Sequence, residues 1–352
     1  MTDATDADDR GAAPPGVSLV LAGAVAKGAF HAGALTVIAE MGIRITKVVG
    51  TSSGALNGCV YAAAIRAGKE REGAARLAQR WIESSDWDDV FSAAPGDILG
   101  GRGLSSMRKI LRMLKESTDG WTPAGRPIAL DLVVSPLRGS PPEQPDDPTT
   151  YEYVTRFCDA AFDTAEKWDE ICRAAAASAS FPGVFAPVEI PALGPCVDGG
   201  AVNNTPIRHA IEGSDSDVIL VVDPHPERAS AQESPKGANL VLQLADILIH
   251  ERLQRDLAQA RSVNRKIEQL DALVRTGRLA PDVRAEILRS FAWRPLRVIP
   301  IRPDPGRPLS GNAFAAFFDG DLRREYVKRG IEAARSALSG PLAADLRAGA
   351  AP

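Results

Sequence analysis

Short apolar runs alternate with longer runs of helical spacing through the first part of the chain. The apolar runs 17–23 and 46–50 each end in glycine, and the segments 28–41 and 55–68 that follow them have the composition and spacing of helices. Strand, helix, strand, helix is the order in which a parallel sheet of the α/β class begins. We therefore predict an α/β fold whose first two strands are parallel neighbours.

The rest of the chain continues this pattern. Further strands are predicted at 127–136, 151–157, 196–200, 217–226 and 295–303, with a loop at 140–150. Further helices are predicted at 70–84, 104–116, 168–180, 237–275 and 321–338. The last predicted strand is apolar enough to rejoin the sheet, which favours one domain over two.

Changes in composition divide the chain into three parts. Residues 1–16 are polar, acidic and rich in proline and glycine, so we expect a disordered tail. Residues 17–226 form the predicted catalytic core. A segment rich in serine, proline and glycine, 227–237, begins a C-terminal extension over 227–352, which we expect to be mostly helical and to pack on the core.

Composition and charge narrow the function classes. The 352 residues are 45% hydrophobic and 24% charged, which is typical of a globular protein with a sizeable core. A net charge of −4 gives no general attraction to nucleic acid. The chain starts without a signal peptide and has no run of ~18 apolar residues, so we expect a cytoplasmic protein, in contact with a membrane at most peripherally.

The four cysteines add no site to this prediction. Cys59, Cys158, Cys172 and Cys196 are widely spaced and form no C-x-x-C pair. Neither a zinc site nor a disulfide framework is indicated.

Ser52 has the sequence context of a nucleophile. It lies between Gly50 and Gly54 in the stretch VVGTSSGALNG, after a β-branched strand and before a helix of small residues. A sharp strand-to-helix turn of this kind exposes a serine hydroxyl at the end of a strand. The alternative is an ordinary glycine-rich loop, because the pentapeptide alone is a weak signal.

A second glycine loop, LAGAVAKGAF, also leads from a strand into a helix. Backbone N–H groups at such a place can hold the negative oxygen that forms during acyl transfer. The spacing matches neither dinucleotide nor P-loop motifs, so the remaining alternative is a plain tight turn. The residues of this candidate oxyanion loop are Gly23, Ala24, Val25, Ala26, Lys27 and Gly28.

Two residues are candidates for taking the proton of Ser52. His225 follows a strand, and Ser52, Asp198 and His225 occur in the order of a Ser-Asp-His esterase. Asp198, followed by Gly199 and Gly200, could instead pair with Ser52 directly, which requires burial to raise the pKa of its carboxyl. The sequence pattern by itself leaves both possibilities open.

The four motifs together resemble the patatin-like phospholipase family. They are the glycine loop ending in Lys-Gly, then GTSSG, ASASFPGVFAPVEI and DGGAVNNTP, in order over about residues 17–225. The resemblance implies a three-layer α/β/α fold and metal-free, cofactor-free hydrolysis of lipid acyl esters. It implies Ser52 as nucleophile, Asp198 as base and residues 23–28 as oxyanion hole, with Pro182 and Phe185 shaping the floor of the site. The expected substrate is a phospholipid or lysophospholipid.

One departure from the family pattern leaves other functions open. The family loop begins with three glycines, whereas this chain has Gly23, Ala24 and Val25. The Cβ atoms of Ala24 and Val25 disfavour positive φ, so either the loop avoids that conformation or the oxyanion hole forms imperfectly. A lipid-binding pseudoenzyme is therefore an alternative, and an acyltransferase would use the same residues.

Two segments are candidates for contact with a membrane. In 104–115, one helical face carries Leu104, Met107, Leu111 and Leu114, and the basic residues lie largely elsewhere. A basic amphipathic helix can lie in a bilayer surface, but we favour packing of its apolar face on the core. The segment 312–320 carries three phenylalanines that form either a lid or part of the packed extension.

Overall fold

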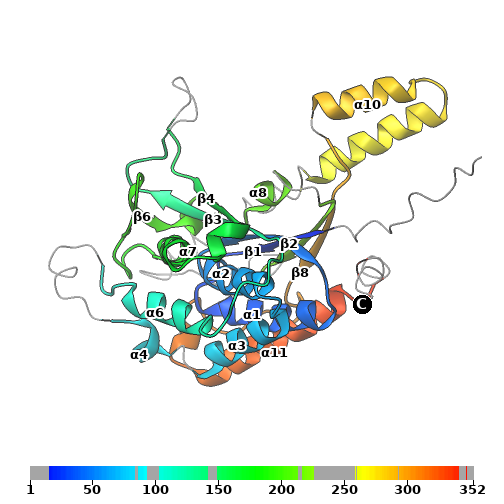
Figure 1. Ribbon diagram of the computed structural model, residues 1–352. Helices are drawn as coiled ribbons and strands as arrows, with labels where there is room; N and C mark the ends of the chain where they lie inside the picture. The colour runs from blue at the N-terminus through cyan, green and yellow to red at the C-terminus, as the bar shows by residue number, and fades with distance from the viewer. Residues whose placement is uncertain are drawn as a thin grey trace, which may run out of the picture.

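The computed structural model describes residues 16–83, 86–92, 103–141, 149–212, 216–225, 258, 260–291, 293–340 and 346 (Figure 1). Its strands are β1 (Val17–Leu21), β2 (Ile45–Thr51), β3 (Ala129–Pro136), β4 (Tyr153–Cys158), β5 (Val188–Ile190), β6 (Gly194–Asp198), β7 (Val218–Val222) and β8 (Arg297–Ile301). Its α-helices are α1 (Ala29–Glu40), α2 (Ser53–Arg66), α3 (Glu70–Glu83), α4 (Trp87–Val90), α6 (Arg108–Ser117), α7 (Ala165–Ser178), α8 (Ile207–Ile211), α10 (Pro281–Ser290) and α11 (Gly320–Ala337). Its 3₁₀ helices are η1 (Val25–Gly28), η2 (Asp159–Phe162), η3 (Gly199–Ala201) and η4 (Ala315–Phe317).

The strands form one eight-stranded sheet in the order β5-β6-β3-β2-β1-β7-β8, with β4 also paired to β3. The five strands from β3 to β8 along this path are mutually parallel. The pairings β3–β4, β3–β6 and β5–β6 are antiparallel. The predicted α/β fold with a mainly parallel sheet is confirmed. The strand expected at 295–303 is β8, which joins the sheet beside β7.

Helices cover both faces of this sheet, unequally. In β1, Leu19 and Leu21 face a large core under α1, α2, α3 and α11, whereas Val20 faces a smaller core under α8. Alternate residues of a strand point to opposite faces, so a strand that is covered on both sides must be apolar throughout. This double burial explains why the strands read as continuous apolar runs.

One predicted helix starts later than its apolar pattern suggests. The helix expected over 104–116 is α6, which begins at Arg108, because Ser105 forms a β-bridge with Phe185. Leu104 therefore lies outside the helix and is 57% exposed, whereas Met107 and Leu114 are buried against the core. The expectation that Leu104 shares a helical face with Met107 is wrong.

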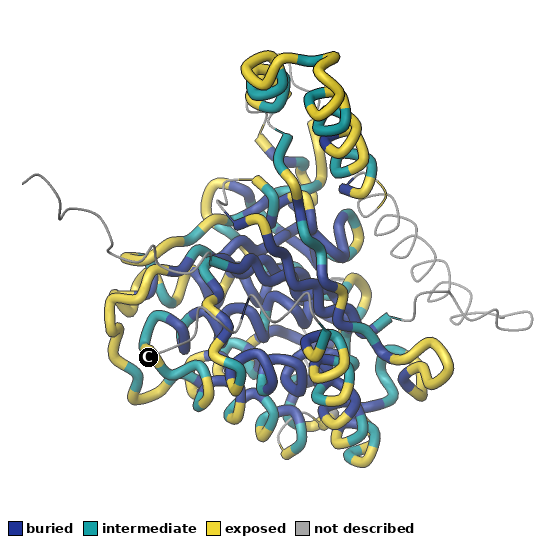
Figure 2. Tube along the Cα trace, turned by 90° about the vertical axis from the view of Figure 1, so that its right-hand side faces the viewer, coloured by how far each residue is buried: buried dark blue, intermediate teal, exposed yellow. Residues whose placement is uncertain are grey.

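The C-terminal segment contributes to both the sheet and the helical layer. Residues 260–275 are helical, as predicted, and with α10 they form a pair of helices that projects from the body with much exposed surface (Figure 2). The earlier part of the helix expected over 237–275 lies outside the described residues, as do 1–15 and 227–237. The last helix, α11, packs against α1 (Figure 1).

Glycines allow α1 and α11 to approach closely. A Cβ placed on Gly33 of α1 would lie 1.9 Å from the carbonyl oxygen of Val327, and one on Gly330 of α11 would lie 2.1 Å from that of Phe30. No real Cβ tolerates such distances, so a larger residue at either position forces the helices apart. The two backbones therefore touch at reciprocal positions.

We expect Gly33→Ala and Gly330→Ala each to lower the free energy of unfolding by about 1–3 kcal/mol, the usual cost of overpacking. Urea denaturation measures the change. Gly340→Ala is the matched control, because no atom lies within 4 Å of the added methyl group. Its effect should stay within about 0.5 kcal/mol. Equal stability of all three variants would show that this helix contact is looser than described.

Candidate active site

Ser52 lies on a sharp turn between β2 and α2. Its backbone has φ 55° and ψ −128°, a conformation that a residue with a side chain rarely adopts. A Cβ on Gly54 would lie 2.1 Å from the carbonyl oxygen of Leu21, and one on Gly50 would lie 2.7 Å from that of Gly54. Gly54 therefore lets the turn lie against β1, and Gly50 lets the start of α2 lie against the end of β2.

Asp198, at the end of β6, accepts a hydrogen bond from Ser52. The distance between Ser52 Oγ and Asp198 Oδ2 is 2.7 Å, and both residues are buried. The other carboxyl oxygen, Oδ1, accepts the N–H of Gly200 at 2.7 Å. A Cβ on Gly199 would lie 2.2 Å from the carbonyl oxygen of Val133, so this glycine lets the turn after Asp198 lie against β3.

Ser178, at the end of α7, links the Ser52 turn to β3. Its hydroxyl accepts the N–H of Ser52 at 3.0 Å and donates to the carbonyl oxygen of Val133 at 2.6 Å. Ser178 belongs to the motif ASASFPGVFAPVEI, but no role was predicted for it from the sequence. The signal in the sequence was a serine hydroxyl at an otherwise apolar helix end. A hydroxyl buried there needs a hydrogen-bond partner, which indicates a structural contact.

Burial raises the pKa of Asp198 to about 7, although the hydrogen bonds from Ser52 and Gly200 act in the opposite direction. Removal of the carboxylate from water disfavours its charged form, which is the effect that a base of useful strength requires. Near neutral pH the group is divided between its protonated and ionised forms. It can therefore both take up and return a proton.

The backbone N–H of Val25 stands out in the loop from Gly23 to Gly28. Val25 has φ 49°, whereas Ala24 avoids the left-handed region with φ −155°. The N–H of Ala24 donates to Ser53 Oγ, that of Ala26 to the carbonyl oxygen of Ala313, and that of Lys27 to that of Ala24. Among the described residues, no acceptor is recorded for the N–H of Val25.

Asn204 fixes the start of this loop. Its side-chain amide donates to the carbonyl oxygen of Gly23 at 2.8 Å, and its backbone carbonyl oxygen accepts the N–H of Gly23 at 2.9 Å. A Cβ on Gly23 would lie 2.1 Å from Asn204 Oδ1 and 3.0 Å from the Cβ of Ser52. Asn204 was present in the quoted motif DGGAVNNTP, but its sequence position alone does not reveal this contact.

Comparison with protein families matches residues 19–211 to the family described as patatin-like phospholipase. The chain belongs to the patatin-like phospholipase family. This membership implies a lipid acyl hydrolase. Among solved structures, VipD from Legionella pneumophila matches with a TM-score of 0.43 and 14% identity, over 93% of this chain and 67% of that one. Comparison with curated proteins gives no match.

The histidine suggested for a Ser-Asp-His arrangement has another partner in this patatin-like protein. His225 Nδ1 lies 2.8 Å from Asp223 Oδ1, and among the described residues no hydrogen bond joins it to Ser52 or Asp198. His31 is fully buried, and burial lowers its pKa to about 3, against the opposing effect of Asp223. Neither histidine is thus placed as the base for Ser52.

A mainly apolar cavity of about 90 Å³ lies beside Ser52 and Asp198. Its walls come from α2, α3, α6, the turn after α7 and η4, and include Leu56, Val60, Leu77, Trp81, Ile110, Met113, Leu114, Phe181, Phe185, Phe314 and Phe317. Phe314 and Phe317 of the segment 312–320 thus line the cavity, whereas Phe318 is 67% exposed. Phe185 lines it as expected, but Pro182 is exposed and does not.

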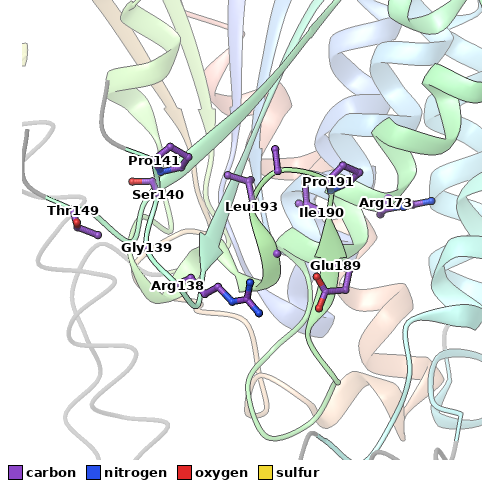
Figure 3. A pocket seen from close by; sticks show the side chains of 12 residues that line it. Arg138, Gly139, Ser140, Pro141, Thr149, Arg173, Glu189, Ile190, Pro191 and Leu193 are labelled. Carbon is purple, nitrogen blue, oxygen red and sulfur yellow. The ribbon is translucent and has the colours of Figure 1, made fainter. Parts of the chain in front are cut away.

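A separate hollow of about 750 Å³ lies beside β5 and the end of β3 (Figure 3). Its lining includes Arg138, Arg173 and Glu189, and Figure 3 shows no residue of the Ser52 site there. The hydroxyl of Ser140 in this hollow hydrogen-bonds to Thr150 and not to a base. We therefore assign no catalytic role to this hollow.

Within the described ranges, no three His, Cys, Asp or Glu side chains are grouped so that they could hold a metal ion. In the same part of the chain, no helix has the length and hydrophobicity needed to cross a bilayer.

We expect Asp198→Asn to stabilise the protein above neutral pH. The unfolded carboxyl ionises near its ordinary pKa of 3.8 and the folded one near 7, so the stability of the wild type falls as pH rises between these values. Asparagine removes this loss. The gain in unfolding free energy is negligible near pH 4 and reaches up to about 4 kcal/mol above pH 7.

Chemical denaturation across this pH range tests the expected gain. Asp282→Asn, which changes an exposed carboxylate on α10, is the control and should show no such growth with pH. A wild type as stable as Asp198→Asn at every pH would mean that burial of the Asp198 carboxylate costs nothing.

Proposed function

We propose that this patatin-like protein hydrolyses acyl esters of phospholipids or lysophospholipids through a Ser52–Asp198 dyad. The observation that carries the proposal is the 2.7 Å hydrogen bond between Ser52 Oγ and Asp198 Oδ2 beside an apolar cavity. A buried carboxylate with a raised pKa supplies the base, and the strained turn places the nucleophile at the cavity wall. Family membership supplies the lipid acyl substrate class.

In the first half of the reaction, Ser52 Oγ attacks the ester carbonyl carbon while its proton moves to Asp198 Oδ2. The tetrahedral intermediate then collapses as Asp198 returns the proton to the departing alcohol oxygen, which leaves an acyl group on Ser52. The hydrogen bond from Gly200 to Oδ1 keeps the carboxyl in place while its charge changes. A single carboxyl thus acts as both base and acid.

The negative oxygen of the intermediate is held by two backbone N–H groups. One is that of Val25, which lines the cavity and has no recorded acceptor among the described residues. The other is that of Ser53, the residue after the nucleophile and the first of α2, where the helix dipole adds positive potential. Of the loop 23–28, which was expected to form the oxyanion hole, we propose only the Val25 N–H as a donor, because the N–H groups of Gly23, Ala24, Ala26 and Lys27 donate elsewhere.

In the second half, a water molecule takes the place of the departed alcohol and loses a proton to Asp198 as it attacks the acyl-enzyme. The bond between the acyl carbon and Ser52 Oγ then breaks, Asp198 returns the proton to Oγ, and the fatty acid leaves. The apolar cavity is the proposed site for the acyl chain, since burial of methylene groups there removes them from water. An alcohol that replaced this water would receive the acyl group instead. Hydrolysis and transfer therefore differ only in the second acceptor.

We expect Ser52→Ala to lose both labelling by a fluorescent fluorophosphonate and release of fatty acid from phospholipid vesicles. Asp198→Asn should lose both as well, because asparagine cannot accept the serine proton. His225→Ala is the matched control and should retain both, because the imidazole bonds to Asp223. Gel fluorescence and fatty-acid titration measure the two activities.

The combination of results separates the alternatives. Loss of activity in His225→Ala would favour a Ser-Asp-His esterase. Lipid binding by a wild type that is neither labelled nor active would point to a lipid-binding pseudoenzyme. Acyl transfer to an added alcohol in excess of hydrolysis would indicate an acyltransferase.

We expect Gly23→Ala to lower turnover by about 10²–10³-fold, the usual cost of losing an oxyanion donor. The new Cβ would collide with Asn204 Oδ1 and displace the loop that carries the Val25 N–H. Val25→Gly keeps that N–H and removes strain of about 1–3 kcal/mol, so it should retain turnover. Vesicle hydrolysis measures both variants, and full activity of Gly23→Ala would contradict the proposed oxyanion hole.

A further inference from the structure

A cavity of about 830 Å³ lies along β8. In the sheet, β1 and β7 separate β8 from β2, the strand that leads to Ser52. Its walls are β8 and the loop that follows it, the helix formed by residues 260–275, and α11. Figure 1 shows β8 between that helix and α11. The cavity has the volume of a small-molecule site, and the proposed hydrolysis uses none of its residues.

The charge of the lining is strongly unbalanced. Five arginines face the cavity, against two carboxylates, Asp304 and Glu332. Asp304 Oδ1 accepts the N–H of Gly306, and Glu332 lies about equally near Lys328 and Arg329, at 4.0 and 3.9 Å. The five arginines are Arg261, Arg297, Arg302, Arg307 and Arg329. The two carboxylates do not neutralise them.

One of these arginines has a buried donor without an acceptor. Arg302 forms an ion pair with Asp223, with 3.2 Å between Nε and Oδ2, whereas its buried Nη2 has no hydrogen-bond partner among the described residues. A buried guanidinium donor that lacks an acceptor is costly, so its presence at a cavity indicates a missing anionic partner. Asp223 also bonds to His225 through Oδ1, so its carboxyl group is shared between two side chains.

Two other arginines have no recorded protein partner for their side chains. Arg261, on the helix of residues 260–275, and Arg307, on the loop after β8, are exposed, and the described residues provide no ion pair for either. The carbonyl oxygen of Arg307 accepts Arg329 Nη2, which fixes this loop beside α11. The guanidinium groups at the cavity therefore come from all three of its walls.

We propose that this cavity is a binding site for a phosphomonoester group. Guanidinium forks match the oxygens of a phosphate in pairs, and a group with up to two negative charges suits a site with several arginines. Both glycerol 3-phosphate and the headgroup of phosphatidic acid carry this group. The site goes beyond the proposed hydrolysis and does not depend on it.

Binding is measured in the full chain carrying Ser52→Ala, so that no lipid is consumed and a failure of the proposed hydrolysis does not affect the result. One arm titrates sn-glycerol 3-phosphate by calorimetry. The other measures sedimentation with phosphatidylcholine vesicles with and without phosphatidic acid. Binding to the first assigns the site to a free phosphomonoester. Binding only to vesicles that contain phosphatidic acid assigns it to a lipid headgroup.

Arg261→Gln combined with Arg307→Gln should weaken binding by at least about tenfold in whichever of the two measurements shows binding, since two charge-assisted hydrogen bonds are lost. Arg275→Gln combined with Arg289→Gln is the matched control. It removes the same charge from exposed positions outside the cavity lining, one at the far end of the helix of residues 260–275 and one on α10, and should leave binding unchanged. Absence of binding in both arms, or equal weakening by the two pairs, would overturn the proposal.

Discussion

The close contact between Gly54 and the end of β1 is the constraint on which the candidate site depends. A Cβ at Gly54 would lie 2.1 Å from the carbonyl oxygen of Leu21, so only glycine lets the β2–α2 turn lie so near β1. That contact brings Ser52 next to the loop that follows β1, because a Cβ on Gly23 would lie 3.0 Å from that of Ser52. The proposed nucleophile and the proposed oxyanion donors are neighbours for this reason.

The site concentrates features that lower stability. Ser52 and Val25 both have positive φ, and Asp198 is a buried carboxyl with a raised pKa. Such conformations persist only where the surroundings hold them, and here Ser178 and Asn204 do so through hydrogen bonds to the backbone. This is the usual exchange of stability for a preorganised site.

Much of the fold could be predicted because the sheet is buried on both faces. Strands of this kind are continuous apolar runs, and β1, β2, β3 and β7 were all recognised from them. Short elements such as β5 and α8 carry too few residues for a periodic pattern and were missed. The start of α6 was misplaced because the bridge between Ser105 and Phe185 is a tertiary contact that the local pattern does not contain.

The sequence by itself determined the α/β class, the order of the main elements and the choice of Ser52 and Asp198 as a candidate pair. These features depend on periodicity and motifs that involve residues close together in the chain. Only the tertiary structure decided which atoms meet. It placed Asp198 at 2.7 Å from Ser52 and His225 beside Asp223, and it gave Ser178 and Asn204 their partners. These contacts join residues from different strands and helices, and their distances follow from packing of the sheet and not from spacing along the chain.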